Sequence, residues 1–132
     1  MKNLICSLLA VSVVIFSTLP TIALEKINGA YKGIIWSNGD NPGETIFSIS
    51  SSNKITGKYV FEGLNSVETG VLKNCKLDTQ TLNCTWADSY GTGDFHVKFS
   101  SDFKTFSGAW FDNEGDYKTY GLSEGHTWNG KK

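Results

Sequence analysis

The chain has 132 residues and a formal net charge of −1, with 12 basic and 13 acidic side chains. Every basic residue is a lysine, so the chain lacks the guanidinium groups that bind phosphate and guanine in two-point contacts. Charged residues make up only 19% of the chain and aromatic residues 13%, which excludes a disordered polar protein. These values predict one small, aromatic-rich β domain that does not bind nucleic acid.

Residues 1–23 have the features of a signal peptide. Lys2 gives a positive start, Leu4–Phe16 is apolar, and small residues precede a predicted cleavage after Ala23. The apolar run is shorter than the ~20 residues of a spanning helix, although an uncleaved anchor is the alternative. We therefore expect a secreted or periplasmic protein without a stable membrane anchor after cleavage, with residues 24–132 as one domain.

Turn-forming residues separate eight stretches that have the alternation of strands. Phe95, Val97 and Phe99 share one face of a predicted strand, which leaves His96 on the opposite, solvent-facing side. The glycine-rich stretch 124–132 is interpreted as a tail that could be disordered, and it includes His126. The predicted strands lie near 29–37, 44–51, 54–62, 67–76, 80–88, 93–101, 104–112 and 116–122.

A short repeat supports a closed sheet. An apolar residue, a small residue and a large aromatic residue recur at alternate positions as Ile55-x-Gly57-x-Tyr59, Leu82-x-Cys84-x-Trp86 and Phe106-x-Gly108-x-Trp110. Small side chains beside bulky rings allow the rings of neighbouring strands to overlap. We predict an all-β, single-domain, eight-stranded antiparallel up-and-down barrel made of four hairpins, with a β-sandwich as the alternative.

Two cysteines in the exported part of the chain predict a disulfide. Cys75 and Cys84 flank a turn at 78–80, so they face each other on adjacent strands at a distance that suits a bridge. Paired cysteines in an exported chain are usually oxidised. A short closed loop of this kind stabilises the fold at the low end of about 2–4 kcal/mol.

No catalytic arrangement is evident, so we predict a protein that is not an enzyme and uses no cofactor. The acidic turns 88–94 and 112–116 carry oxygen ligands of the kind that bind Ca²⁺, but neither has the spacing of a known calcium loop. Ordinary hairpin turns are the favoured interpretation, and we predict no metal site.

The aromatic residues are the main functional indication. Most should be buried, whereas Tyr90 in a turn and Phe111 opposite Trp110 are expected to be exposed. Trp36 and Trp128 are expected at a barrel mouth, where exposed rings often bind apolar or sugar ligands.

Two motifs resemble known families. The stretch 82–110, with its W-x-D turn, G-x-G-x-F strand, S-x-D turn and F-x-G-x-W strand, resembles small exported bacterial proteins of unknown function. Trp36-Ser37-Asn38-Gly39, followed by Ile55-Thr56-Gly57-Lys58-Tyr59, resembles the opening hairpins of avidin-like barrels, which bind a small ligand inside. This second resemblance implies that Asn38 and Tyr59 are ligand-facing positions.

The predicted function is a non-catalytic binding module that takes a small ligand at the barrel mouth through Trp36, Asn38, Tyr59 and Trp128. The alternative is protein binding, including protease inhibition, through the N-terminal segment or the turn loops. Periplasmic metalloprotease inhibitors are also small eight-stranded barrels with one disulfide, and they use an N-terminal trunk that 24–28 could supply. The small molecule or protein partner is not identified by the sequence. Interior volume distinguishes the two, because a ligand site needs an open cavity of about 300 Å³ or more.

Overall fold

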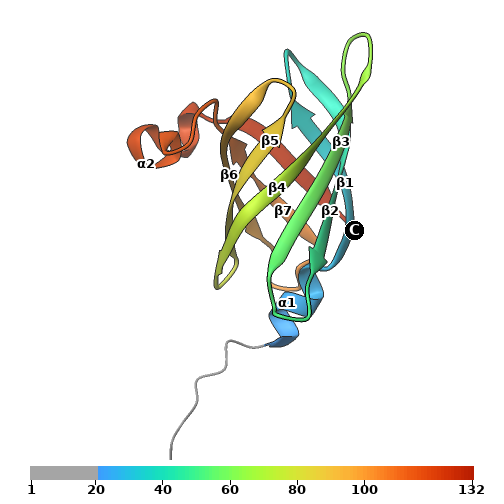
Figure 1. Ribbon diagram of the computed structural model, residues 1–132, viewed down its shortest axis with the longest axis vertical. Coiled ribbons are helices and arrows are strands. Elements are labelled where there is room, and N and C mark those ends of the chain that lie inside the picture. Colours follow the sequence, from blue (N-terminus) through green and yellow to red (C-terminus); the bar gives the residue numbers. More distant parts are fainter. Residues whose placement is uncertain (1–20) are drawn as a thin grey trace, which may run out of the picture.

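Residues 21–132 are described by a computed structural model, and they form a closed antiparallel barrel of eight strands (Figure 1). Each strand pairs with the next along the chain, and β1 closes the barrel by pairing with β8. The predicted up-and-down barrel is confirmed, and the sandwich alternative is wrong. The elements are α1 (Thr21–Ile27), β1 (Gly29–Trp36), β2 (Asp40–Ile49), β3 (Ile55–Glu62), β4 (Val67–Asp78), β5 (Thr81–Asp88), β6 (Gly91–Phe99), β7 (Thr105–Trp110), α2 (Asp116–Tyr120), η1 (Leu122–Glu124) and β8 (His126–Lys131).

The signal-peptide prediction lies mostly outside the described residues. Its expected cleavage point, after Ala23, falls within α1. Within residues 21–132, no helix combines the length and the apolar character needed to cross a membrane.

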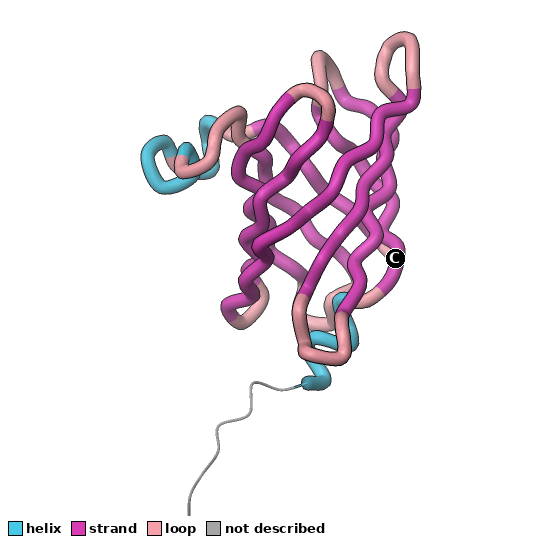
Figure 2. Tube along the Cα trace, viewed as in Figure 1, coloured by secondary structure: helices cyan, strands magenta, loops and turns pink. Residues whose placement is uncertain are grey.

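The prediction for the last strand is wrong. The stretch near 116–122 forms α2 and η1, which project from the side of the barrel beside β6, whereas β8 lies in the expected tail (Figures 1 and 2). Gly115 and Gly121 bracket α2 with φ angles of 89° and 75°, a conformation that favours glycine and interrupts an extended strand. The tail is ordered because Trp128 is buried among the rings of the barrel.

Aromatic side chains fill the barrel interior at the end near α1, away from the first residues of β8. Tyr31, Phe47, Phe95, Phe99 and Phe106 meet there, with several ring pairs in edge-to-face contact at centroid distances of 5.3 to 5.9 Å. Edge-to-face pairs each add about 0.5–1.5 kcal/mol beyond the burial of their surface. This end therefore has no room for a ligand.

The filled end is also covered by the N-terminal segment. Ile27 is completely buried and Leu24 half-buried, while the Tyr31 hydroxyl donates to the carbonyl of Phe103 at 2.7 Å. The 24–28 segment, which we considered as a trunk for a protein partner, thus packs across the base of the barrel (Figure 1).

Cys75 and Cys84 form the predicted disulfide between β4 and β5. The register of this strand pair shifts between Lys73 and Lys76, and Asn74 within the shift has a φ of 54°. Such a bulge turns the following side chains to the other face of the strand. The alternation of apolar and polar residues in the sequence does not predict this bulge.

Two predictions of exposure are wrong because α2 covers part of the outer wall. His96 is only 8% exposed, since the ring of Tyr117 stacks on it at 3.6 Å and Asn83 contacts its Nδ1. Burial lowers the pKa of His96 below its usual value, although the nearby Asp94 opposes this. Phe111, at 3% exposed, is also buried.

Candidate ligand site at the barrel mouth

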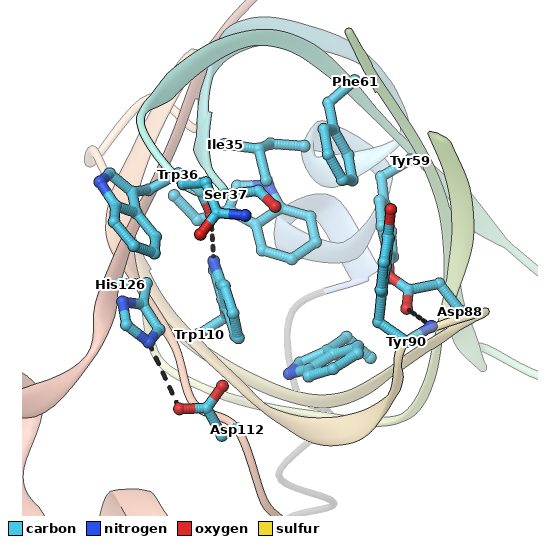
Figure 3. A pocket seen from close by; sticks show the side chains of 13 residues that line it. Ile35, Trp36, Ser37, Tyr59, Phe61, Asp88, Tyr90, Trp110, Asp112 and His126 are labelled. Carbon is cyan, nitrogen blue, oxygen red and sulfur yellow. Dashed lines mark hydrogen bonds and ion pairs between the residues drawn. The ribbon is translucent and has the colours of Figure 1, made fainter. Parts of the chain in front are cut away.

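The end of the barrel opposite α1 contains a cavity of about 440 Å³ that opens to solvent (Figure 3). Its walls come from the ends of β1, β3, β5 and β7, the start of β8 and the turns between these strands. The lining residues are Ile35, Trp36, Ser37, Asn38, Tyr59, Phe61, Trp86, Asp88, Tyr90, Trp110, Asp112, His126 and Trp128.

All four residues singled out as ligand-binding from the sequence line this cavity. Trp36 is half-buried at the rim, and Asn38 is exposed in the β1–β2 turn with a φ of 55°. Tyr59 is a buried wall residue. Trp128 is 2% exposed and lies deeper than expected for a rim residue, so it forms part of the floor.

The sequence prediction missed most of the walls. Trp86 and Trp110, which we had not assigned to the site, line the same cavity as Tyr59. These three residues occupy the large aromatic position of the three repeat units. The repeat was interpreted as core packing alone, yet its last position in each unit also builds the mouth.

The floor of the cavity is fixed by contacts of Trp128. Its ring lies between those of Tyr59 and Phe95, edge-to-face with each at 4.7 Å. Its indole Nε1 donates to the buried hydroxyl of Thr45 at 2.9 Å. Since the indole N–H is engaged, Trp128 offers a ligand only ring surface.

The other two wall tryptophans are engaged in the same way. Trp86 Nε1 donates to the carbonyl of Phe111 at 2.8 Å. Trp110 Nε1 donates to the carbonyl of Trp36 at 2.9 Å (Figure 3). The rings of Trp86 and Trp110 meet edge-to-face at 5.3 Å. These bonds tie β5 to the segment after β7, and β7 to β1, across strands that are not paired with each other, and they hold both rings in place.

A tyrosine–aspartate pair spans three strands on one wall. Tyr59 on β3 is opposite Gly70 on β4, which is opposite Asp88 on β5. The Tyr59 hydroxyl crosses Gly70 and donates to Asp88 Oδ2 at 2.7 Å. A Cβ at Gly70 would lie 2.2 Å from Tyr59 Cζ, so the crossing requires a glycine.

Burial and the carboxylate of Asp88 both raise the pKa of Tyr59 far above its usual value, so the phenol stays protonated as a hydrogen-bond donor. The second oxygen of Asp88, Oδ1, accepts the backbone N–H of Tyr90 at 2.8 Å. Asp88 is thereby held in place by two neutral donors.

The rim carries a histidine held between two tryptophans. The His126 ring stacks on Trp36 at 4.6 Å and lies 4.3 Å from the Trp110 ring, while its Nε2 is 3.4 Å from Asp112 Oδ2 (Figure 3). Tyr90 is 72% exposed, as predicted, and its hydroxyl donates to Glu68 at 3.1 Å.

In the two acidic turns that carry possible calcium ligands, 88–94 and 112–116, carboxylates instead accept backbone N–H groups. Asp94 Oδ2 accepts the backbone N–H of Tyr117 at 3.0 Å, and Asp116 Oδ2 accepts that of Asn113 at 3.2 Å, so these carboxylates fasten α2. In the part of the chain that the structure describes, no three His, Cys, Asp or Glu side chains gather in a group that could hold a metal ion.

Comparison of the chain with protein-family models, with curated proteins and with solved structures finds no match. The resemblances to small exported bacterial proteins and to avidin-like barrels therefore stay predictions.

Proposed function

We propose that this protein is an exported, non-catalytic binding module that takes a small ligand at the barrel mouth. The observation that carries the proposal is the cavity of about 440 Å³ with aromatic walls. Ligand sites in proteins commonly have volumes of about 300–1,000 Å³ and combine apolar walls with a few fixed polar groups. Here the other end of the barrel is filled with rings, so the mouth is the end suited to a ligand.

The alternative of protein binding through the 24–28 segment has less support. Ile27 is completely buried, so that a partner would have to displace it from the base of the barrel. Catalysis also has less support. Ser37, His126 and Asp112 share the cavity, but among residues 21–132 no hydrogen bond joins Ser37 to His126 to activate a nucleophile.

The proposed location is the periplasm or the exterior of the cell. A disulfide persists in oxidising compartments and is rare in the cytosol. This agrees with the leader expected from the sequence.

Native mass spectrometry of protein purified from its own source tests the proposal, because a bound small molecule adds mass to the folded protein. We expect the parent protein and Tyr120→Ala to retain a ligand, since Tyr120 is exposed on α2 and is not among the residues that line the cavity. Trp36→Ala should lose it, because that ring forms part of the rim.

A second measurement covers a ligand that is lost on purification. The indole N–H resonances of the cavity tryptophans should shift when a member of a small-molecule fragment library binds. Protein that carries no ligand and whose indole resonances respond to no fragment would contradict the proposal.

A further inference from the structure

The charges around the cavity have one sign. Asp88 and Asp112 are its two carboxylates, His126 is its remaining ionisable side chain apart from tyrosines, and no lysine is among the thirteen lining residues of the described chain. Because field lines concentrate in a cavity with low-dielectric walls, two carboxylates there attract cations and repel anions.

The hydrogen-bonding groups in the walls are biased in the same direction. The indole N–H groups of Trp86, Trp110 and Trp128 and the hydroxyl of Tyr59 all donate to protein acceptors. The Asp88 carboxylate receives one donor on each oxygen and keeps further lone pairs, since a carboxylate has about four acceptor sites. The inner walls therefore offer acceptors, which suits a ligand that donates hydrogen bonds or carries positive charge, while the side-chain donors of Trp36, Ser37 and Asn38 lie at the rim.

The aromatic surface completes the pattern. The faces of tryptophan and tyrosine rings attract ammonium groups within about 6 Å of the ring centroid, with most gain where water is excluded. Seven aromatic residues line the cavity: Trp36, Tyr59, Phe61, Trp86, Tyr90, Trp110 and Trp128. In Figure 3, Tyr59 and Tyr90 lie with Asp88 on one side of the opening, and Trp110 lies with Asp112 on the other.

From this combination we propose that the barrel mouth binds an organic cation, an amine or quaternary ammonium group carried on a small apolar body. The inference rests on the proposed function and names the ligand class of the same site. The cationic group sits among the rings near Asp88, and the apolar body extends towards the floor at Trp128. An anionic ligand placed beside Asp88 would lose its hydration without gaining donors from the inner walls.

Three probes of nearly the same shape separate charge from shape: choline (positive), 3,3-dimethylbutan-1-ol (neutral) and 3,3-dimethylbutanoate (negative). Titration of the ¹⁵N-labelled protein, followed through its indole resonances, gives an affinity for each probe. We expect choline to bind about ten-fold more tightly than the neutral alcohol, and the carboxylate to bind least. Added salt should weaken the binding of choline and leave that of the alcohol nearly unchanged.

Charge-removing variants locate the effect. Asp112→Asn removes a charge from a side chain that is 71% exposed, so the fold should tolerate it, and choline affinity should fall about two- to five-fold. Asp88→Asn should cause a larger loss, because Asp88 lies deeper in the wall. Asp78→Asn is the matched control at the closed end of the barrel and should leave choline affinity unchanged.

Each outcome decides between the two proposals. Equal or tighter binding of the alcohol or the carboxylate overturns the cation proposal and leaves a small-ligand site in place. An equal loss of choline affinity in Asp112→Asn and Asp78→Asn also overturns the cation proposal, because the attraction would then be a general effect of net charge. If none of the three probes shifts the resonances, the cation proposal fails, and the small-ligand role depends on the fragment library alone.

Discussion

Replacing Gly70 with alanine should break the tyrosine–aspartate pair from the strand between its two partners. The added Cβ would lie 2.2 Å from both Cζ and the hydroxyl oxygen of Tyr59, whereas ordinary contacts begin at 3.4 Å. Gly70 has no positive φ that would itself resist a side chain. The strain therefore falls on the tyrosine ring, which must move by about 1 Å and leave Asp88.

The magnitude follows from the contacts that this movement breaks. A hydrogen bond to a charged group contributes about 1.5–3 kcal/mol, and the edge-to-face contact of Tyr59 with Trp128 about 0.5–1.5 kcal/mol. Alanine regains about 0.5–1 kcal/mol, because glycine is unfavourable inside a strand. We expect Gly70→Ala to lower the free energy of unfolding by about 1–4 kcal/mol.

Urea unfolding followed by tryptophan fluorescence measures this change, with an unchanged m-value as the sign that the folded state stays compact. The control is the same substitution in a Tyr59→Leu background, where no ring crosses position 70. There the alanine should be neutral or stabilise by up to about 1 kcal/mol. If Gly70→Ala costs the same in both backgrounds, the tyrosine does not depend on the glycine and the reasoning is refuted.

Three further predictions concern stability. Replacing Cys75 and Cys84 with serine should lower the free energy of unfolding by about 2–3 kcal/mol in urea, and in the unreduced parent protein neither cysteine should react with an alkylating agent, as mass measurement would show. Burial lowers the pKa of His96 in the folded state, so its contribution to the free energy of unfolding is fully present above the unfolded-state pKa near 6.5 and is lost as the pH falls from there towards the folded-state pKa. His96→Gln should flatten this part of the plot of unfolding free energy against pH. An unchanged slope in that plot would contradict the prediction. Tyr31→Phe should cost about 1–2 kcal/mol, since the buried carbonyl of Phe103 loses its donor, while choline affinity stays unchanged because Tyr31 lies at the closed end.

The barrel itself could be predicted because alternation and the three-unit repeat are local features of the chain. Seven strands were placed within a few residues, whereas the eighth was assigned to α2. Gly115 was interpreted as part of a turn between strands, Gly121 fell within the predicted last strand, and the glycines beside Trp128 were interpreted as signs of disorder. What orders β8 is the contact of Trp128 with rings from other strands, and no local pattern reports such a contact.

The site was only partly predictable for a related reason. Trp36 and Trp128 were singled out as aromatic residues expected at a mouth, and Asn38 and Tyr59 through the resemblance to avidin-like barrels. Asp88 belonged to what was interpreted as an ordinary turn, and its position beside Tyr59 depends on the registers of two strand pairs. The bulge at Lys73–Lys76 lies in one of those pairs, and a shift of one residue would exchange the faces of a strand.

The placement of the C-terminus has a practical consequence. α1 and the last residue both lie away from the mouth, and Lys132 contacts the carbonyl of Lys26 at the base of the barrel (Figure 1). A tether, affinity tag or surface linkage attached at the C-terminus would therefore leave the opening facing outward and unobstructed. Immobilised protein could be used directly to capture solutes from a flowing extract.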